Sequence, residues 1–329
     1  MSLLPSTTEI LFALGAGDQV VGVTFECDYP PEARQRRIVS TSSLPEGLEP
    51  AAVDRLVAER LARGEDLYHL DEGALAGLDA DLIVTQDLCA VCAVDVTEVR
   101  DALDYLACTA EVLTIDPQDL DEVLESILVL GTATGTEARA TALVDDLAGR
   151  LQAVRDRLVG RPAVPTAVLE WTDPPFAPGH WVPDMVVSAG GASVLGTAGA
   201  KSYRTTWDDV ASAAPDVVVC APCGFGLDDS ARLAAEVAGR GVLPDGVPLW
   251  AVDANASFAR PGPRLVDGVE ALAAILHPDE FGTADPELAA RVVYVIIGQP
   301  VRRVPSGPPG LRSRLLLREM LTRSRRTVG

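Results

Sequence analysis

The sequence has few of the residues that enzyme sites and nucleic-acid-binding surfaces need. It contains three His and no sequence motif of a serine nucleophile elbow, a phosphate-binding loop, a metalloprotease helix or a dinucleotide-binding turn. Basic residues are scarce too, because 27 Lys and Arg stand against 48 Asp and Glu and give a net charge of -21. Nucleic acids and anionic membranes bind to basic surfaces, so neither is expected as a partner. These deficits favour a binding protein for a neutral or cationic ligand over an enzyme.

Long apolar runs are also lacking. No stretch approaches the roughly 18 apolar residues of a membrane span, and the first residues, MSLLPSTTEILFALGAG, have no basic start and include Glu9. We therefore expect a cytoplasmic protein for the chain as given, and an extracytoplasmic one if the true start lies upstream. Without an export signal, the six Cys are expected to be reduced thiols.

Strand-like apolar runs alternate along the chain with segments of helical periodicity. Strands are predicted over residues 19–25, 67–70, 81–85, 110–115, 166–171, 216–220 and 247–252. Helices are predicted over 51–63, 72–78, 185–189, 207–213, 228–239 and 264–276. Alternating strands and helices form parallel sheets, so the fold class is α/β with two Rossmann-like lobes.

The segment between the two halves keeps its helical periodicity for an unusual length. It predicts one long rigid helix over 119–160, or two helices in succession around residues 131–135. One continuous helix implies small lobe movement on binding. The domains are then an N-terminal lobe (1–118), the linking helix, a C-terminal lobe (161–278) and a basic tail (279–329). Residues 285–329 hold nine Arg and three acidic residues, so we expect a poorly ordered segment that is dispensable for binding.

Five segments of the chain follow one another in a recognisable order: LLPSTTEILFALGAGDQVVGVTFECDYP, LDEGALAGLDADLIVTQDLCAVC, PPFAPGHWVPDMVVSAGGASVLG, SYRTTWDDVASAAPDVVVCAPCGF and DANASFARPGPRLVDGVEALAAILHP. Together they resemble the substrate-binding proteins of vitamin B12 and ferric-siderophore ABC importers, and most closely the cobalamin-binding branch. The resemblance implies two lobes bridged by a rigid helix, with a corrinoid such as cobalamin or cobinamide as the ligand in the cleft between them. It implies no cofactor, a monomer, and the permease of an ABC importer as partner. Glutamates on each lobe dock on the importer in this family; Glu46, Glu49 and Glu72 are candidates by position.

Each candidate ligand loop follows a predicted strand. Ligands of open α/β sheets bind outside the carboxyl ends of the strands, so loops from both lobes should meet at one cleft. Aromatic side chains there would stack on the corrin plane, and a few polar groups would anchor its amide edges, although any one aromatic residue can belong to a lobe core instead. The candidate ligand-binding residues are Glu26, Cys27, Asp28, Tyr29, Trp171, Phe176, His180, Trp181, Phe225, Asn255, Phe258 and Arg260.

The thiols and one histidine allow several kinds of metal chemistry. His180, Cys89 and Cys92 are candidate metal ligands, and a neutral His180 imidazole could ligate the cobalt of a corrinoid. The alternative is that His180 only bonds a neighbouring loop carbonyl. The pairs Cys89–Cys92 and Cys220–Cys223 could also form a zinc site or a redox pair, or have no chemistry at all.

Two other functions are compatible with the same residues. One is a cytosolic carrier or sensor of a corrinoid or metal chelate that never meets an importer. The other is a metal-dependent enzyme on the two-lobed scaffold of nitrogenase-like proteins, whose cluster the loop thiols would hold. Fold analogy alone does not separate binding from chemistry.

Overall fold

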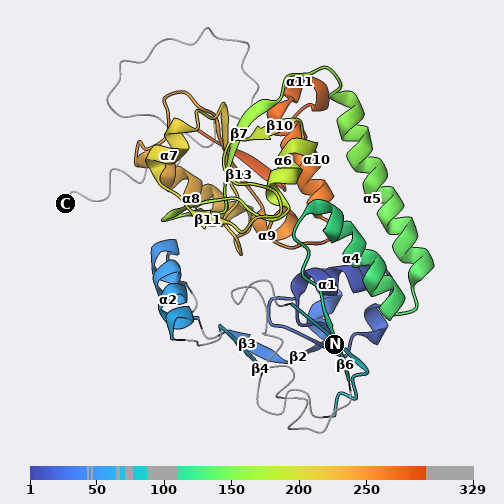
Figure 1. Ribbon diagram of the computed structural model, residues 1–329. Helices are drawn as coiled ribbons and strands as arrows, with labels where there is room; N and C mark the ends of the chain where they lie inside the picture. The colour runs from blue at the N-terminus through green and yellow to red at the C-terminus, as the bar shows by residue number, and fades with distance from the viewer. Residues whose placement is uncertain (43, 46, 64–66, 71–76, 87–109, 294–329) are drawn as a thin grey trace, which may run out of the picture. The chain divides into compact units, whose positions relative to one another are not determined.

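The N-terminal lobe is built on a small parallel sheet that has the first residues of the chain at its centre. This computed structural model describes residues 1–42, 44, 45, 47–63, 67–70, 77–86 and 110–293 (Figure 1). Ser2 bridges two strand pairs in parallel, through Val23 on one side and Val84 on the other. The parallel pairs are β1 (Gly22–Val23) with β2 (Arg37–Ile38), and β5 (Leu82–Thr85) with β6 (Glu111–Thr114). β3 (Ser40–Ser42) and β4 (Tyr68–Leu70) form a separate antiparallel pair.

Helix α1 (Pro5–Ala13) starts directly after this central segment and is buried on most of its surface. Pro5 stands in the first turn, where its missing N–H costs nothing, and Gly15 ends the helix region with a positive φ of 69°. Ile10 and Leu11 are buried, and so are Thr7, Thr8 and Glu9. A helix buried on several faces must find partners for its polar side chains as well. The lobe also contains 3-10 turns η1 (Gly17–Gln19) and η2 (Pro31–Gln35), and helix α2 (Pro50–Ala62).

The C-terminal lobe is a five-stranded sheet covered on both faces. Its order is β10-β7-β12-β13-β14, and neighbours are parallel except for β14 against β13. Successive residues of β12 pack into different apolar clusters, Val217 and Val219 in one, Val218 and Cys220 in the other, as expected for a strand buried on two sides. The strands are β7 (Val164–Leu169), β10 (Gly191–Ser193), β12 (Val217–Cys220), β13 (Leu249–Val252) and β14 (Ala289–Val292).

Helices and a small antiparallel sheet complete this lobe. The helices are α6 (Val182–Ser188), α7 (Trp207–Ser212), α8 (Leu227–Gly239), α9 (Ala254–Ser257), α10 (Leu265–Leu276) and α11 (Pro278–Phe281). The small sheet has the order β11-β9-β8, with β8 (Trp171–Thr172), β9 (Pro175–Ala177) and β11 (Tyr203–Arg204).

Two helices join the lobes, so the alternative of two helices in succession is correct and a single continuous helix is wrong. α4 (Leu120–Ala133) and α5 (Glu137–Arg157) lie side by side and run in opposite directions (Figure 1). A Cβ on Gly131 would lie 2.4 Å from the Cβ of Ala140, so this glycine permits the close approach of the two helices. Arg150 of α5 donates to Asp267 and Glu270 of α10, which fixes α5 on the C-terminal lobe.

The C-terminal lobe extends beyond the expected boundary at residue 278. α11 and β14 follow it, and β14 pairs with β13 from Ala289 to Val292. The prediction that a poorly ordered tail starts at 279 is therefore wrong for residues 279–292. Met1–Tyr294 form one compact unit, while the second unit, Val295–Gly329, lies outside the described residues.

Candidate ligand-binding site

Three loops at the carboxyl ends of C-terminal strands contact one another, as predicted. Trp171 follows β7, Phe225 follows β12 and Asn255 follows β13. The rings of Trp171 and Phe225 are 5.6 Å apart between centroids, and the Asn255 N–H donates to the Phe225 carbonyl over 3.1 Å. The two rings and the Asn255 side chain are half-buried, so each keeps some surface for a ligand.

The N-terminal loop that carries the other candidates reaches the C-terminal lobe through Arg260. Nη1 of Arg260 donates to Asp28 over 2.5 Å and to Glu9 over 3.1 Å, and Nη2 donates to the Glu26 carbonyl over 3.2 Å. Burial alone would lower the pKa of Arg260, but Asp28 and Glu9 raise it above its ordinary value. Arg260 is 8% exposed, so it ties the lobes together rather than offering a free cation to a ligand, contrary to its predicted role.

Glu9 and Arg264 complete this arrangement, and neither was predicted as a site residue. Arg264 donates from Nε and Nη2 to the two carboxylate oxygens of Glu9, over 2.8 and 2.5 Å. Glu9 is 4% exposed and receives these bonds in addition to the one from Arg260. An acidic residue inside the apolar run of α1 was the available signal, because a buried carboxylate needs a cationic partner. We call Glu9, Asp28, Arg260 and Arg264 the ion cluster.

Tyr29 lies on the ion cluster and points partly into solvent. The guanidinium carbon of Arg264 is 4.0 Å from the centre of the Tyr29 ring, and Tyr29 is 45% exposed. Tyr29 therefore remains a strong candidate for contact with a ligand.

The start of helix α2 makes a second set of contacts with the C-terminal lobe. The indole N–H of Trp171 donates to the Pro50 carbonyl over 3.3 Å. Arg204 donates from Nη2 to both carboxylate oxygens of Asp54 over 2.8 Å, and its guanidinium lies 5.8 Å from the centre of the Phe176 ring. We call the ion cluster, these α2 contacts and the aromatic residues Tyr29, Trp171, Phe176 and Phe225 the lobe junction.

Three predicted ligand residues are core residues instead. Cys27 and Phe258 are each 2% exposed, and Trp181 is 7% exposed. The Trp181 indole N–H donates to the Phe258 carbonyl over 2.7 Å, which satisfies its polar group inside the lobe. The Cys27 sulfur accepts a bond from the Thr8 hydroxyl over 3.1 Å. These side chains cannot present a surface to a ligand in this conformation.

His180 lies in a loop that its own backbone holds in place. Its N–H donates to the Ala200 carbonyl, its carbonyl accepts from Gly199, and its φ is 49°. Nε2 is covered by protein and has no hydrogen-bond partner among the described residues. Burial, and secondarily the charge of Lys201, lower the pKa of His180 below 6.5. Its ring is thus neutral at pH 7, but Nε2 cannot reach the cobalt of a ligand in this conformation.

The described thiols show little metal-binding character. Burial raises the pKa of Cys220 to about 12 and, against weaker hydrogen bonds, raises that of Cys27, so neither is a thiolate at neutral pH. Cys223 is exposed. Within the described part of the chain, no three His, Cys, Asp or Glu side chains gather as a metal site would need. Cys89 and Cys92 lie outside the described residues.

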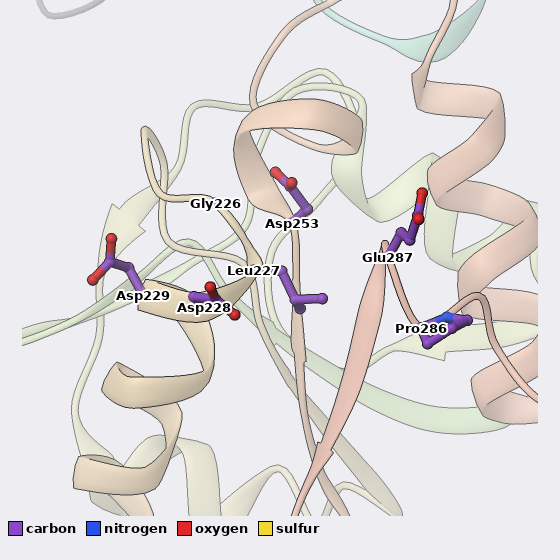
Figure 2. A pocket seen from close by; sticks show the side chains of 7 residues that line it. All are labelled: Gly226, Leu227, Asp228, Asp229, Asp253, Pro286 and Glu287. Atoms are coloured by element: carbon purple, nitrogen blue, oxygen red, sulfur yellow. The ribbon is translucent and has the colours of Figure 1, made fainter.

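Two cavities have walls that do not include the aromatic residues of the lobe junction. One of about 450 Å³ has the acidic residues Asp228, Asp229, Asp253 and Glu287 on its walls. Figure 2 shows Asp228 and Asp229 at the start of α8 and Glu287 on the loop before β14. Another, of about 600 Å³, lies along α5 and α10. The first has no aromatic residue on its walls and the second has only Phe281, whereas a flat macrocycle needs more aromatic area.

Known proteins share both the sequence pattern and the fold. An uncharacterized ABC transporter substrate-binding lipoprotein of Bacillus subtilis, YvrC, is 26% identical over 292 residues, which cover 85% of this chain and 80% of that protein. The cobalamin-binding protein of Halobacterium salinarum strain R1 is 26% identical over 290 residues, which cover 84% of this chain and 69% of that protein.

Solved structures place the fold among two-lobed periplasmic binding proteins. A periplasmic heme-binding protein of Pseudomonas aeruginosa has a TM-score of 0.66 at 19% identity, with 89% of this chain and 97% of that chain covered. The vitamin B12 binding protein BtuF of Vibrio cholerae has a TM-score of 0.58 at 20% identity, with 84% and 94% covered.

The family model that matches the chain covers most of its length. It is the model of periplasmic binding proteins, and it matches residues 1–239. Within the described residues, no helix combines the length and the apolar composition of a membrane span. Proteins of this family hold their substrates as cargo and need no cofactor. The chain belongs to the periplasmic binding protein family, as a non-enzymatic substrate-binding protein of the ABC importer type.

Proposed function

We propose that this protein binds a corrinoid, such as cobalamin or cobinamide, at the lobe junction and delivers it to an importer permease. Relatives of the chain include proteins named as cobalamin-binding, and its fold neighbours include both vitamin B12 and heme binders. Another fold neighbour is named as part of an Fe3+-hydroxamate transport system. The family likeness thus supports a metal-containing ligand, and the choice among such ligands depends on the residues of this chain.

Charge cancellation at the lobe junction is the observation that carries the choice of a corrinoid. Arg260 and Arg264 share the carboxylates of Glu9 and Asp28, and Arg204 shares that of Asp54. These guanidinium groups are therefore already neutralised by acids of the protein itself. Heme carries two propionates and many siderophore complexes are anionic, whereas the edge of a corrin carries neutral amides. A net charge of -21 opposes anionic ligands further.

The aromatic residues of the lobe junction supply the apolar area. Tyr29 comes from the N-terminal lobe, and Trp171, Phe176 and Phe225 come from the C-terminal lobe. Tyr29 is exposed and the other three are half-buried, so each can contribute a face or an edge to a flat macrocycle. Asn255 can donate to an amide carbonyl at the edge of the ligand. His180 contributes to the loop's structure in this proposal and is not a cobalt ligand.

Calorimetric titration against four ligands tests the proposal. We expect heat and saturation with cyanocobalamin and dicyanocobinamide, and little or none with hemin or ferric enterobactin, which are both anionic. The variants Tyr29→Ala and Trp171→Ala should each weaken corrinoid binding about tenfold, which is about 1.4 kcal/mol. Phe281→Ala is the matched control, because this half-buried ring lies on α11 beside the α5–α10 cavity. Binding of hemin with no binding of either corrinoid would refute the proposal.

The importer and the compartment follow from the same proposal. We place the protein outside the cytoplasmic membrane and beside a permease, since one relative is named as a lipoprotein. Glu49 is exposed and shares a 3.3 Å ion pair with Arg232, while Glu46 and Glu72 lie outside the described residues. If Glu49 docks on the importer, Glu49→Gln should lower ligand-dependent uptake in reconstituted vesicles and leave corrinoid affinity unchanged. Unchanged uptake would exclude Glu49.

A further inference from the structure

The ring of Tyr29 lies on an arginine that comes from the other lobe. Tyr29 belongs to the loop after β1, and Arg264 immediately precedes α10 in the C-terminal lobe. The distance from the Arg264 guanidinium carbon to the ring centre is 4.0 Å, well inside the range of a cation–π contact. The orientation of an exposed N-terminal aromatic side chain is thus coupled to a C-terminal residue.

Arg264 itself is held in one plane. Its Nε and Nη2 both donate to Glu9, so the edge of the guanidinium is fixed by a two-pronged carboxylate contact. The flat face remains available for the Tyr29 ring. Only arginine can satisfy both contacts at once, because a lysine ammonium has neither a flat face nor a rigid fork.

The rest of the ion cluster stiffens the backbone next to Tyr29. Arg260 donates to the Asp28 side chain and to the Glu26 carbonyl, on the residues that lead into Tyr29. It also donates to Glu9, the residue that holds Arg264. The loop and the ring are therefore fixed from the same buried carboxylate, which is 4% exposed.

We propose that Arg264 is a positioning residue of the ligand site, which fixes the plane of the Tyr29 ring so that the N-terminal wall of the site forms only where the lobes meet. The effect of Arg264 on ligand affinity rests on the proposed corrinoid function. The effect of Arg264 on the plane of the Tyr29 ring does not, so each effect is measured separately.

The ring itself can be observed without any ligand. Incorporation of 3-fluorotyrosine gives a fluorine NMR signal for each of the five tyrosines, and Tyr29→Phe identifies the signal of Tyr29. Arg264→Lys keeps the charge but removes the flat fork, so we expect the Tyr29 signal to move and sharpen as the ring gains freedom. The control is Arg157→Lys, which alters a similar contact of 4.1 Å between Arg157 and Phe281 and should leave the Tyr29 signal in place.

Affinity for cyanocobalamin supplies the second measurement. We expect Arg264→Lys to raise the Kd about three- to fivefold, at the scale of one partly exposed cation–π contact. The same change on a Tyr29→Leu background should have no further effect, because the ring that Arg264 positions is gone. Thermal melts show that each variant is folded, and Arg157→Lys should bind like the wild type.

Two results would overturn the proposal. One is an unchanged Tyr29 fluorine signal in folded Arg264→Lys. The other is an equal loss of affinity from Arg264→Lys with and without Tyr29, which would mean that Arg264 acts through the fold at large. If the wild type binds no corrinoid, the proposed function fails, and the fluorine signal still decides whether Arg264 positions the ring.

Discussion

Removing the charge of Glu9 should destabilise the protein more than any surface carboxylate does. The side chain of Glu9 is 3% exposed and those of its partners Arg260 and Arg264 are 9% and 20% exposed. Glu9→Gln keeps the shape but leaves two mostly buried guanidinium groups short of a carboxylate. Breaking a buried ion pair from one side costs about 3–5 kcal/mol. Arg260 keeps Asp28, so we expect a loss of about 3 kcal/mol in the free energy of unfolding.

Urea denaturation at pH 7 measures this loss. The matched control is Glu236→Gln, which breaks an i,i+4 pair with Arg232 in which both side chains are more than 40% exposed. Such a pair contributes about 0.3–0.5 kcal/mol, so the two variants should differ several-fold. Salt should reduce the control's effect and leave the Glu9 effect largely intact, because buried charges are poorly screened. A loss below about 1 kcal/mol for Glu9→Gln would show that the ion cluster contributes little to the stability of the fold.

Three further predictions concern other contacts. Asp54→Asn should break the contact of Arg204 with both carboxylate oxygens, which ties α2 to the C-terminal lobe, and should therefore speed cyanocobalamin association in stopped-flow measurements. An unchanged association rate would mean that α2 does not limit entry of the ligand. Truncation after residue 284 should lower the melting temperature because it removes β14, whereas truncation after Val293 should not and should also preserve ligand binding. Burial and Lys201 lower the pKa of His180, so the unfolded chain takes up a proton first as pH falls through about 6.5, and stability is lost there. The loss between pH 7 and pH 5 should be smaller in His180→Gln, and equal curves would exclude this origin.

Local sequence patterns predicted most helices and strands, because the spacing of apolar residues along the chain determines which face of each element is buried. The segments 51–63 and 228–239, which have helical spacing, form α2 and α8, and the β-branched run at 216–220 forms β12. β14 was missed because its four residues include an exposed Arg291, and it is a strand only through its pairing with β13. The break between α4 and α5 was left open, since helical periodicity continues on both sides of Gly135 and only packing of the two helices against each other selects the turn.

The contacts between the candidate loops could be predicted better than the burial of their side chains, and ligand binding by these residues stays a prediction. Following the ends of strands selected loops that do contact one another, those of Trp171, Phe225 and Asn255, and it selected Tyr29, which lies on Arg264. The same reasoning selected Trp181 and Phe258, because a position after a strand does not determine whether a side chain points to solvent or to the core. Glu9 was noticed only as a charge in an apolar run, and its partners are 251 and 255 residues away along the chain. Contacts of that separation are set by the fold as a whole.

The choice of ligand can be tested through a residue whose main contact is with Arg260. Asp28 shares the Nη1 group of Arg260, and its side chain is 32% exposed. Asp28→Asn keeps a hydrogen-bond acceptor and removes one negative charge, so the lobe junction gains a net positive charge. Two unit charges about 4 Å apart interact by about 1–4 kcal/mol near a surface, so an anionic macrocycle should gain at least about fivefold in affinity.

The ratio of hemin to cyanocobalamin affinity is the quantity to measure. It should rise about fivefold or more in Asp28→Asn, because cyanocobalamin carries no net charge and its affinity should hardly change. Asp146→Asn is the control, since it makes the same change in net charge at an exposed position of α5 and should leave the ratio as it is. If both variants give the wild-type ratio, the acids of the ion cluster do not select the ligand. If Asp28→Asn alone shifts it, the specificity of this protein depends on a carboxylate that neutralises an arginine.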